Sequence, residues 1–347
     1  MSRYDLTRQE LSSLLDGEPG YRLEQVWGAM YTGLLDPAAI TTLPRSLRAR
    51  LAAEPALAPA FTEAAESVSD AGQTRKWLLV AADGNAVEAV LMRYRHRLTV
   101  CVSSQAGCAM GCGFCATGQA GYFRQLSPGE MTEQLVLANR KSLELGWGRV
   151  SNIVLMGMGE PLANYRNVMA ALHAWNEHMG VGARSITVST VGIVPGIVRL
   201  AAEALQVNLA VSLHAANDEL RSELVPVNRR YPLAKLMEAC RAYVDRTHRR
   251  LSFEWACISG VNDRLSDAVE LAALAGPLGA HVNLIPLNPT PGYLVAGSPL
   301  SRVRSFRDEL VSRGVNSTIR HTRGREVDGA CGQLAGAAQV TARARLA

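Results

Sequence analysis

The sequence lacks any run of about 18 apolar residues, and we therefore expect no membrane-spanning segment. It also lacks the charged-then-apolar pattern of a secretory signal in its first residues, so we expect a cytoplasmic protein. Seven cysteines in such a chain argue against a disulfide framework. The chain has 347 residues, of which 48% are hydrophobic. This is enough to build one large α/β domain with an appendage, or two domains.

Lysine is scarce, because only three of the 36 basic residues are lysines and the rest are arginines. The arginines are unevenly spread. One basic cluster spans residues 93–97, just before Cys101, and several more arginines lie between residues 302 and 325. Such clusters suit an RNA backbone, although a solvated helix face explains them nearly as well. Charge alone therefore favours an RNA partner only slightly.

Three cysteines, Cys108, Cys112 and Cys115, form a CxxxCxxC motif with Phe114 directly before the last one. Three thiolates can bind three irons of a [4Fe–4S] cluster, which leaves the fourth iron open for chemistry. The alternative is a structural zinc site with Cys101 as the fourth ligand. Zinc ligands usually occur as two separated CxxC-like pairs, and the sequence has no second pair. The spacing favours the cluster and leaves zinc as the alternative.

Local patterns divide the chain into parts. Short helices are expected up to about residue 70, including amphipathic stretches at 21–27 and 44–52. Strand-like segments follow at 77–80, 87–92 and 98–102, and the turn Asp83-Gly84-Asn85 predicts a hairpin between the first two. The predicted domains are a helical accessory domain (1–75), a β extension (76–100), a core (101–337) and a tail (338–347).

From residue 127 onward, helical and strand-like segments alternate. Strands are expected at 152–156, 185–189, 208–212, 251–257, 281–287 and 316–320, and helices at 127–145, 165–179, 194–205, 232–248, 266–278 and 301–312. Repeated βα units predict a parallel sheet with right-handed crossovers. About six units are too few for a closed eight-stranded barrel. We therefore predict a partial, open α/β barrel, with a doubly wound sheet as the alternative.

Polar residues follow four of the predicted strands. They are Gly159 and Glu160, Ser189, Ser212 and His214, and Asn288. Each has a simpler explanation alone: the glycines could form a tight turn, the serines could cap helices, and the histidine could be a satisfied rim residue. In parallel barrels, however, ligands gather where the strands end. The shared location therefore favours a polar cup for a zwitterionic, ribose-bearing ligand.

These motifs resemble the RlmN/Cfr family of radical S-adenosylmethionine (SAM) RNA methyltransferases, most closely its RlmN branch. Besides the cysteine motif, the resemblance rests on residues 101–108, 157–162, 212–215, 283–289, 323–325 and 330–334. It runs from about residue 75 to 337, and the helical start also looks like the family's accessory domain. The resemblance implies a partial (βα)6 radical SAM barrel with an N-terminal helical accessory domain and a small β extension.

The resemblance also implies the cofactors. A [4Fe–4S] cluster on Cys108, Cys112 and Cys115 is expected to bind SAM at its open iron, with two SAM molecules used per turnover. The positions that match the family's SAM contacts are Gly159, Glu160, Ser189, Ser212, Leu213, His214 and Asn288. An electron donor such as flavodoxin or ferredoxin, an RNA substrate and a monomeric state are further expectations.

Three further residues acquire roles only through the resemblance. Cys331 matches the cysteine that carries the methyl group, Cys101 the cysteine that resolves the protein–RNA adduct, and Glu88 the proton-accepting carboxylate. From the residues alone, Cys331 would be a buried free thiol, as Cys240 and Cys257 are expected to be. Glu88, in an otherwise apolar strand, could equally lie on a solvated face.

The implied reaction is methylation of carbon-2 of adenosine in 23S rRNA and in certain tRNAs, through an S-methylcysteine intermediate. Carbon-2 of adenine is electron-poor and cannot attack the SAM methyl group directly, so a radical route is needed. Carbon-8 methylation by the Cfr branch is the nearest alternative. A zinc-stabilised RNA-binding module without catalysis is the alternative from a different class.

Overall fold

The alternating segments form a parallel sheet in the computed structural model, which describes residues 2–290, 292–320, 323–324, 327–329 and 331–334. Seven parallel strands lie within this part of the chain, and each pairs with the next in chain order. They are β4 (Arg97–Cys101), β7 (Asn152–Leu155), β8 (Ile186–Thr190), β9 (Asn208–Ser212), β10 (Leu251–Cys257), β11 (His281–Pro286) and β12 (Ser317–Ile319).

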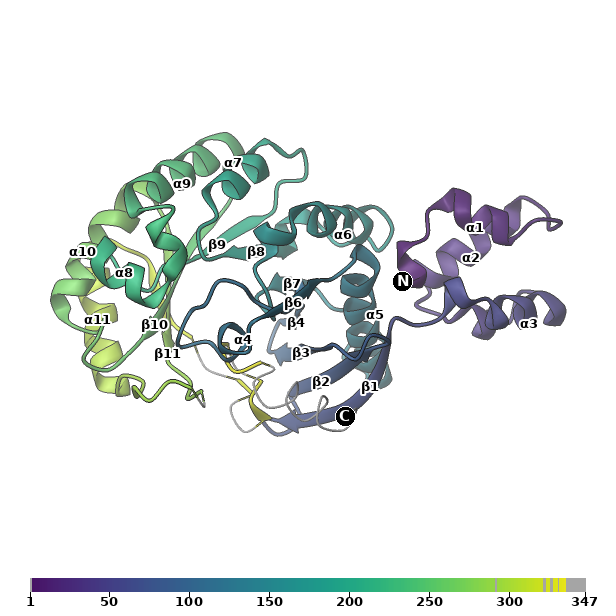
Figure 1. The fold of residues 1–347 in the computed structure, drawn as a ribbon, viewed down its shortest axis with the longest axis horizontal. Helices are drawn as coiled ribbons and strands as arrows, with labels where there is room; N and C mark the ends of the chain where they lie inside the picture. The colour runs from purple at the N-terminus through teal and green to yellow at the C-terminus, as the bar shows by residue number, and fades with distance from the viewer. Residues whose placement is uncertain (1, 291, 321–322, 325–326, 330, 335–347) are drawn as a thin grey trace.

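The helices that connect the parallel strands cover the outer face of this sheet (Figure 1). They are α5 (Pro128–Glu144), α6 (Tyr165–Glu177), α7 (Val194–Ala202), α9 (Leu233–Thr247), α10 (Leu265–Ala275) and α11 (Leu300–Ser312). The strand order never reverses, so the sheet is singly wound and not doubly wound. Within the described residues β12 does not pair with β4, and the barrel is open. The predicted partial barrel is confirmed.

An antiparallel extension continues the sheet beyond β4. It consists of β1 (Phe61–Ser69), β2 (Thr74–Ala81) and β3 (Ala86–Tyr94), and the predicted hairpin turn closes with the Gly84 amide donating to Ala81 at 2.9 Å. The expectation of short helices up to about residue 70 is wrong for β1. Its solvent-facing residues are Thr, Glu and Ala, which hide the strand pattern, and pairing with β2 imposes it.

The N-terminal residues fold as a small helical module that projects from the barrel (Figure 1). Its helices α1 (Arg8–Leu14), α2 (Tyr21–Tyr31) and α3 (Arg45–Ala53) enclose an apolar cluster that also includes Val136 of α5. Asp5 joins the module to the barrel because its carboxylate accepts hydrogen bonds from the Gly129 amide and the Ser127 hydroxyl, both at 2.7 Å. These groups lie at the amino terminus of α5, where an acidic side chain is favourable.

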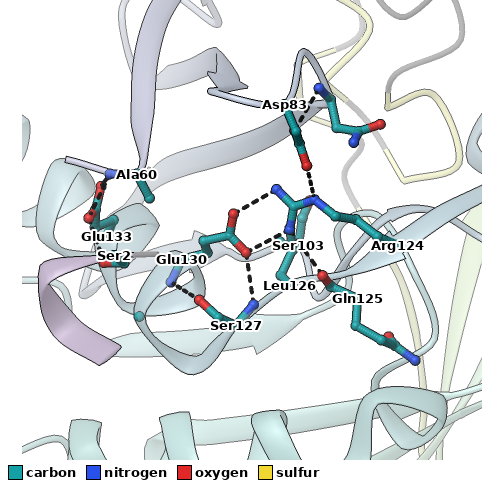
Figure 2. Close-up of polar contacts among 12 residues, drawn as sticks. Ser2, Ala60, Asp83, Ser103, Arg124, Gln125, Leu126, Ser127, Glu130 and Glu133 are labelled. Carbon is teal, nitrogen blue, oxygen red and sulfur yellow. Dashed lines mark hydrogen bonds and ion pairs between the residues drawn. The ribbon is translucent and has the colours of Figure 1, made fainter. Parts of the chain in front are cut away.

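A two-stranded ribbon holds the base of the cysteine loop. Its strands are β5 (Gln105–Gly107) and β6 (Tyr122–Gln125), and the three motif cysteines lie between them. Figure 2 shows Arg124 of β6 donating to both oxygens of Glu130, at 2.7 and 2.8 Å, and pairing with Asp83 of the β2–β3 turn. The same view shows Glu133 of α5 accepting from Ser2 at 2.6 Å and from the Ala60 amide.

The remaining short elements connect these parts. Among them are α4 (Ala116–Gln119) after the cysteine motif and α8 (Asp218–Leu224) after β9.

No helix in the described part of the chain is long and apolar enough to cross a bilayer. The predicted tail at 338–347, and positions 325 and 330 of the motifs, lie outside the described residues.

The Arg124 pairs generate a stability prediction. Arg124→Met should lower the free energy of unfolding by about 2 kcal/mol, because it leaves the largely buried Glu130 carboxylate without its bidentate partner. Urea unfolding of the holoprotein measures the loss. The control Arg313→Met removes a solvent-exposed pair with Glu309 and should cost less than about 0.5 kcal/mol. Equal losses in the two variants would contradict the prediction.

Candidate active site

A deep hollow opens at the carboxyl ends of the parallel strands. It encloses about 1070 Å3 of space, its open mouth included, which is enough for a cluster and a nucleoside-sized ligand. Ten of the thirteen predicted site residues line it. They are Cys108, Cys112, Cys115, Gly159, Glu160, Ser189, Ser212, His214, Asn288 and Cys331. We call this hollow the upper chamber.

The three motif cysteines face the upper chamber from the loop between β5 and β6. Burial raises the pKa of Cys108 to about 12, and it also raises the pKa values of Cys112 and Cys115. These thiols therefore become thiolates when a metal replaces their protons. Among the described residues, no three His, Cys, Asp or Glu side chains converge on a single metal ion. A cubane cluster takes one cysteine per iron, so three cysteines can hold three of its four irons.

Phe114 and His214 form one wall of the chamber. Their rings meet edge to face with centroids 4.8 Å apart. The His214 backbone has φ +61°, and its ring Nδ1 accepts a hydrogen bond from the Ala256 amide at 2.9 Å. Burial, with a contribution from Arg221, lowers the pKa of His214 to about 3. The imidazole is thus neutral and carries its proton on Nε2, so it is a hydrogen-bond donor.

The turn after β7 packs closely against the segment that contains Ser103 and Gln105. A Cβ atom on Gly157 would lie 2.7 Å from Ser103 Oγ, and one on Gly159, at φ +99°, would lie 2.5 Å from the Gln105 Cβ. Glycine is therefore required at both positions. The next residue, Glu160, is buried and accepts hydrogen bonds from the Val191 amide at 2.8 Å and the Leu162 amide at 3.0 Å. Burial still raises its pKa to about 7.

The other strand-end residues have distinct contacts. The Ser189 hydroxyl donates to the Leu155 carbonyl, and the Asn288 amide donates to the Cys331 carbonyl at 3.2 Å. In the described structure neither Ser189 nor Ser212 caps a helix, so the simpler explanation of the serines is wrong. Leu213 is fully buried and its side chain does not line the chamber. Its amide donates to the Glu254 carbonyl at 3.0 Å.

A second, smaller hollow adjoins the upper chamber and contains Cys101. Cys331 lines both hollows, so residues 230 positions apart in the sequence are brought together. Burial and, to a lesser extent, the nearby Cys331 raise the pKa of Cys101 to about 12, although Arg320 acts in the opposite direction. All seven cysteines are free thiols.

Glu88 lies beside this region and does not line either hollow in the described part of the structure. It is buried on β3, and its carboxylate pairs with Lys76 Nζ at 2.9 Å. The solvated-face explanation of Glu88 is therefore wrong. Lys76 also reaches the Asp328 carbonyl, at 3.4 Å, which connects this pair to the segment that carries Cys331.

Sequence reasoning missed the residues that support these loops. Arg221 is completely buried, and it donates to the carbonyls of Val191, Ser212 and Leu213. Gln105 accepts from the Glu160 amide at 2.7 Å. No local pattern distinguishes a buried arginine or glutamine from an exposed one, so only the packed structure could find them.

Comparison with known proteins now decides the family. Residues 102–272 match the model of the Radical SAM superfamily. The chain is 49% identical to a probable dual-specificity RNA methyltransferase RlmN of Chloroflexus aurantiacus over 96% of this chain and 92% of the relative, and 51% identical to that of Thermobifida fusca over 92% and 90%. The chain belongs to the RlmN family of radical SAM RNA methyltransferases.

The fold agrees with this assignment. A solved radical SAM methyltransferase from Sphaerobacter thermophilus superimposes with a TM-score of 0.92 at 50% identity, over 97% of this chain and 99% of that one. As an RlmN-family member, the chain is an enzyme that methylates RNA, and its family implies a [4Fe–4S] cluster and SAM. The buried thiols, the required glycines and the polar strand ends of the upper chamber fit both groups.

Glu160 generates a prediction about pH. Glu160 matches a SAM-contacting position of the family, and with a pKa of about 7 its carboxylate is increasingly protonated below neutrality and is then a poor hydrogen-bond acceptor. The dissociation constant for SAM, measured by anaerobic equilibrium dialysis, should rise up to about tenfold per pH unit below pH 7 and stay constant above pH 8. His214 is neutral throughout this range and does not contribute.

Glu160→Gln should weaken SAM binding at pH 8 and remove the pH dependence. The control Glu177→Gln changes an exposed carboxylate of α6 and should leave both properties unchanged. If the pH dependence survived in the Glu160 variant, another group would be responsible for it.

Proposed function

We propose that the enzyme methylates carbon-2 of adenosine in 23S rRNA and in certain tRNAs, through an S-methylcysteine on Cys331. The observation that carries this proposal is the position of Cys331. It lines the upper chamber, where SAM would lie, and the adjoining hollow that holds Cys101. A cysteine that first receives a methyl group and later exchanges with a second cysteine needs access to both places.

When bound, the cluster and two SAM molecules per turnover supply a transferable methyl group, an electron and a carbon radical. Cys108, Cys112 and Cys115 are proposed to hold the cluster. The proposed SAM contacts are the strand-end residues Gly159, Glu160, Ser189, Ser212, Leu213, His214 and Asn288. Of these, Leu213 can contribute only through its backbone, because its side chain is buried in the core.

Cys331 and Cys101 are proposed to have separate roles in the reaction. The Cys331 sulfur takes a methyl group. The carbon radical supplied by a second SAM would then remove a hydrogen atom from that methyl group, whose carbon bonds to carbon-2 of adenine, and the adduct would return one electron to the cluster. Cys101 accepts the carbon-2 proton and attacks the Cys331 sulfur, which releases the methylated base and leaves a Cys101–Cys331 disulfide. Because burial raises the pKa of Cys101 to about 12, its thiol must first lose its own proton to a base before the sulfur can accept the carbon-2 proton or attack Cys331. Glu88, paired with Lys76, is proposed to receive the proton finally.

Aromatic and cationic side chains at the second hollow support RNA binding there. Arg97 and Arg323 both stack on the Tyr94 ring, at 4.6 and 4.7 Å from its centroid. Tyr94 and Arg323 line the hollow that contains Cys101. Guanidinium groups and aromatic rings are the partners that single-stranded bases stack on. We further propose that residues 1–75 contact RNA, that a flavodoxin or ferredoxin donates electrons, and that the enzyme acts as a cytoplasmic monomer.

Nucleoside analysis tests the position that is methylated. RNA treated in vitro with the reconstituted enzyme, reductant and SAM should contain 2-methyladenosine and no 8-methyladenosine after digestion and mass spectrometry. Separate reactions with ribosomal RNA fragments and with tRNA test the two substrates. A digest that contains only 8-methyladenosine would assign the enzyme to the Cfr type of reaction.

Cysteine variants test the proposed carrier and resolver. Cys101→Ala should accumulate a covalent protein–RNA adduct, visible as a shifted band in denaturing gels, because the second thiol is missing. Cys331→Ala should abolish methylation and form no adduct while its cluster absorbance remains. Cys240→Ala is the matched control, since that thiol is buried in the core away from both hollows. Methylation by the Cys331 variant would disprove the carrier role.

A further inference from the structure

The barrel interior below the upper chamber is polar and hollow. Parallel α/β barrels usually fill this region with layers of Val, Ile and Leu. Here the inward positions of successive strands carry Thr99, Asn152, Thr187, Asn208, Ser252 and Asn283, and they line a cavity of about 1530 Å3, its open mouth included. We call this cavity the lower hollow. It opens at the amino ends of the strands, opposite the upper chamber.

Two buried polar atoms in the lower hollow lack a partner. Thr99 is 6% exposed and Glu254 is 4% exposed, yet within the described structure Thr99 Oγ1 and Glu254 Oε2 form no hydrogen bond. The other Glu254 oxygen accepts from Asn283 at 2.8 Å and from Ser252 at 3.1 Å, which fixes the carboxylate. A buried polar atom without a hydrogen-bond partner lowers the stability of the fold. We therefore expect a polar molecule to form the missing hydrogen bonds with these two atoms.

Three exposed arginines line the mouth of the lower hollow. Arg97, Arg184 and Arg250 come from the beginnings of three different strands. In the described part of the chain, none of them forms an ion pair with a carboxylate. Arginines that converge without acidic partners create a positive potential, and their planar guanidinium groups suit phosphate oxygens. The mouth therefore favours a phosphorylated ligand.

We propose that the lower hollow binds a free mononucleotide, with its phosphate at the three arginines and its base inside the barrel. Inorganic phosphate would satisfy the arginines but would leave the interior amides, hydroxyls and carboxylate unpaired. An uncharged sugar would leave the arginines unused. The open Glu254 Oε2 and Thr99 Oγ1 can accept hydrogen bonds from the N–H groups of a base, and guanine has two neighbouring N–H donors. The lower hollow adjoins the upper chamber, because Met156, Glu254 and Arg320 line both, but it shares none of the chamber's cysteines or glycines.

Isothermal titration with guanosine 5′-monophosphate tests the proposal. The protein is the anaerobically reconstituted full chain saturated with SAM, so that the upper chamber is occupied. One molecule should bind per chain, more weakly as salt increases, and guanosine without phosphate should bind at least tenfold more weakly. The double variant Arg184→Ser/Arg250→Ser should lose at least tenfold in affinity.

Two further variants separate this site from general charge attraction. Arg302→Ser/Arg304→Ser removes the same charge from the exposed face of α11 and should change the affinity less than twofold. Thr187→Leu fills the interior and keeps the arginines, so it should lose the nucleotide but retain weak binding of inorganic phosphate. SAM binding by each variant confirms that the barrel is folded.

Three results would overturn the proposal. The first is no nucleotide binding, which would mean that only water fills the lower hollow. The second is an equal loss in the two double arginine variants. The third is guanosine binding as tightly as its monophosphate.

Discussion

Parallel hydrogen bonding between strands that follow one another in chain order is the constraint on which the site depends. Because each crossover returns on the same side, every strand ends at the same rim. The residues after β7, β8, β9 and β11 therefore meet there without any long-range sequence signal. A reversal in this order would place some of the helices on the opposite face of the sheet, and the sheet would then not curve into a barrel around the site.

The amino end of α5 ties the peripheral parts to that rim. Asp5 of the helical module caps this end, and Arg124 of the ribbon below the cysteine loop pairs with Glu130 in the first turn. The helical module and the cysteine loop are thus attached to the same turn of one helix. Any RNA held by the module would have a defined position relative to the upper chamber.

Much of this arrangement could be predicted from the sequence, because strand and helix periodicity are local properties. The βα alternation gave the open barrel, and the strand-end polar residues gave most of the chamber lining. β1 could not be predicted, because its pattern depends on pairing with β2. The meeting of Cys101 with Cys331, the buried Arg221 and the polar lower hollow depend on packing between distant segments.

The burial of the motif thiols has a consequence for how the metal centre is assembled. In the metal-free protein each of these sulfurs carries a proton, since burial raises all three pKa values. Cluster insertion is then an exchange of three protons for a charged inorganic group, and acid conditions oppose it. The loop is closed at its base by the β5–β6 ribbon, outside the main sheet. Because Cys112 and Phe114 pack in one apolar cluster with Ala256 and Leu287 of the barrel, the loop already has a defined place before the cluster is inserted.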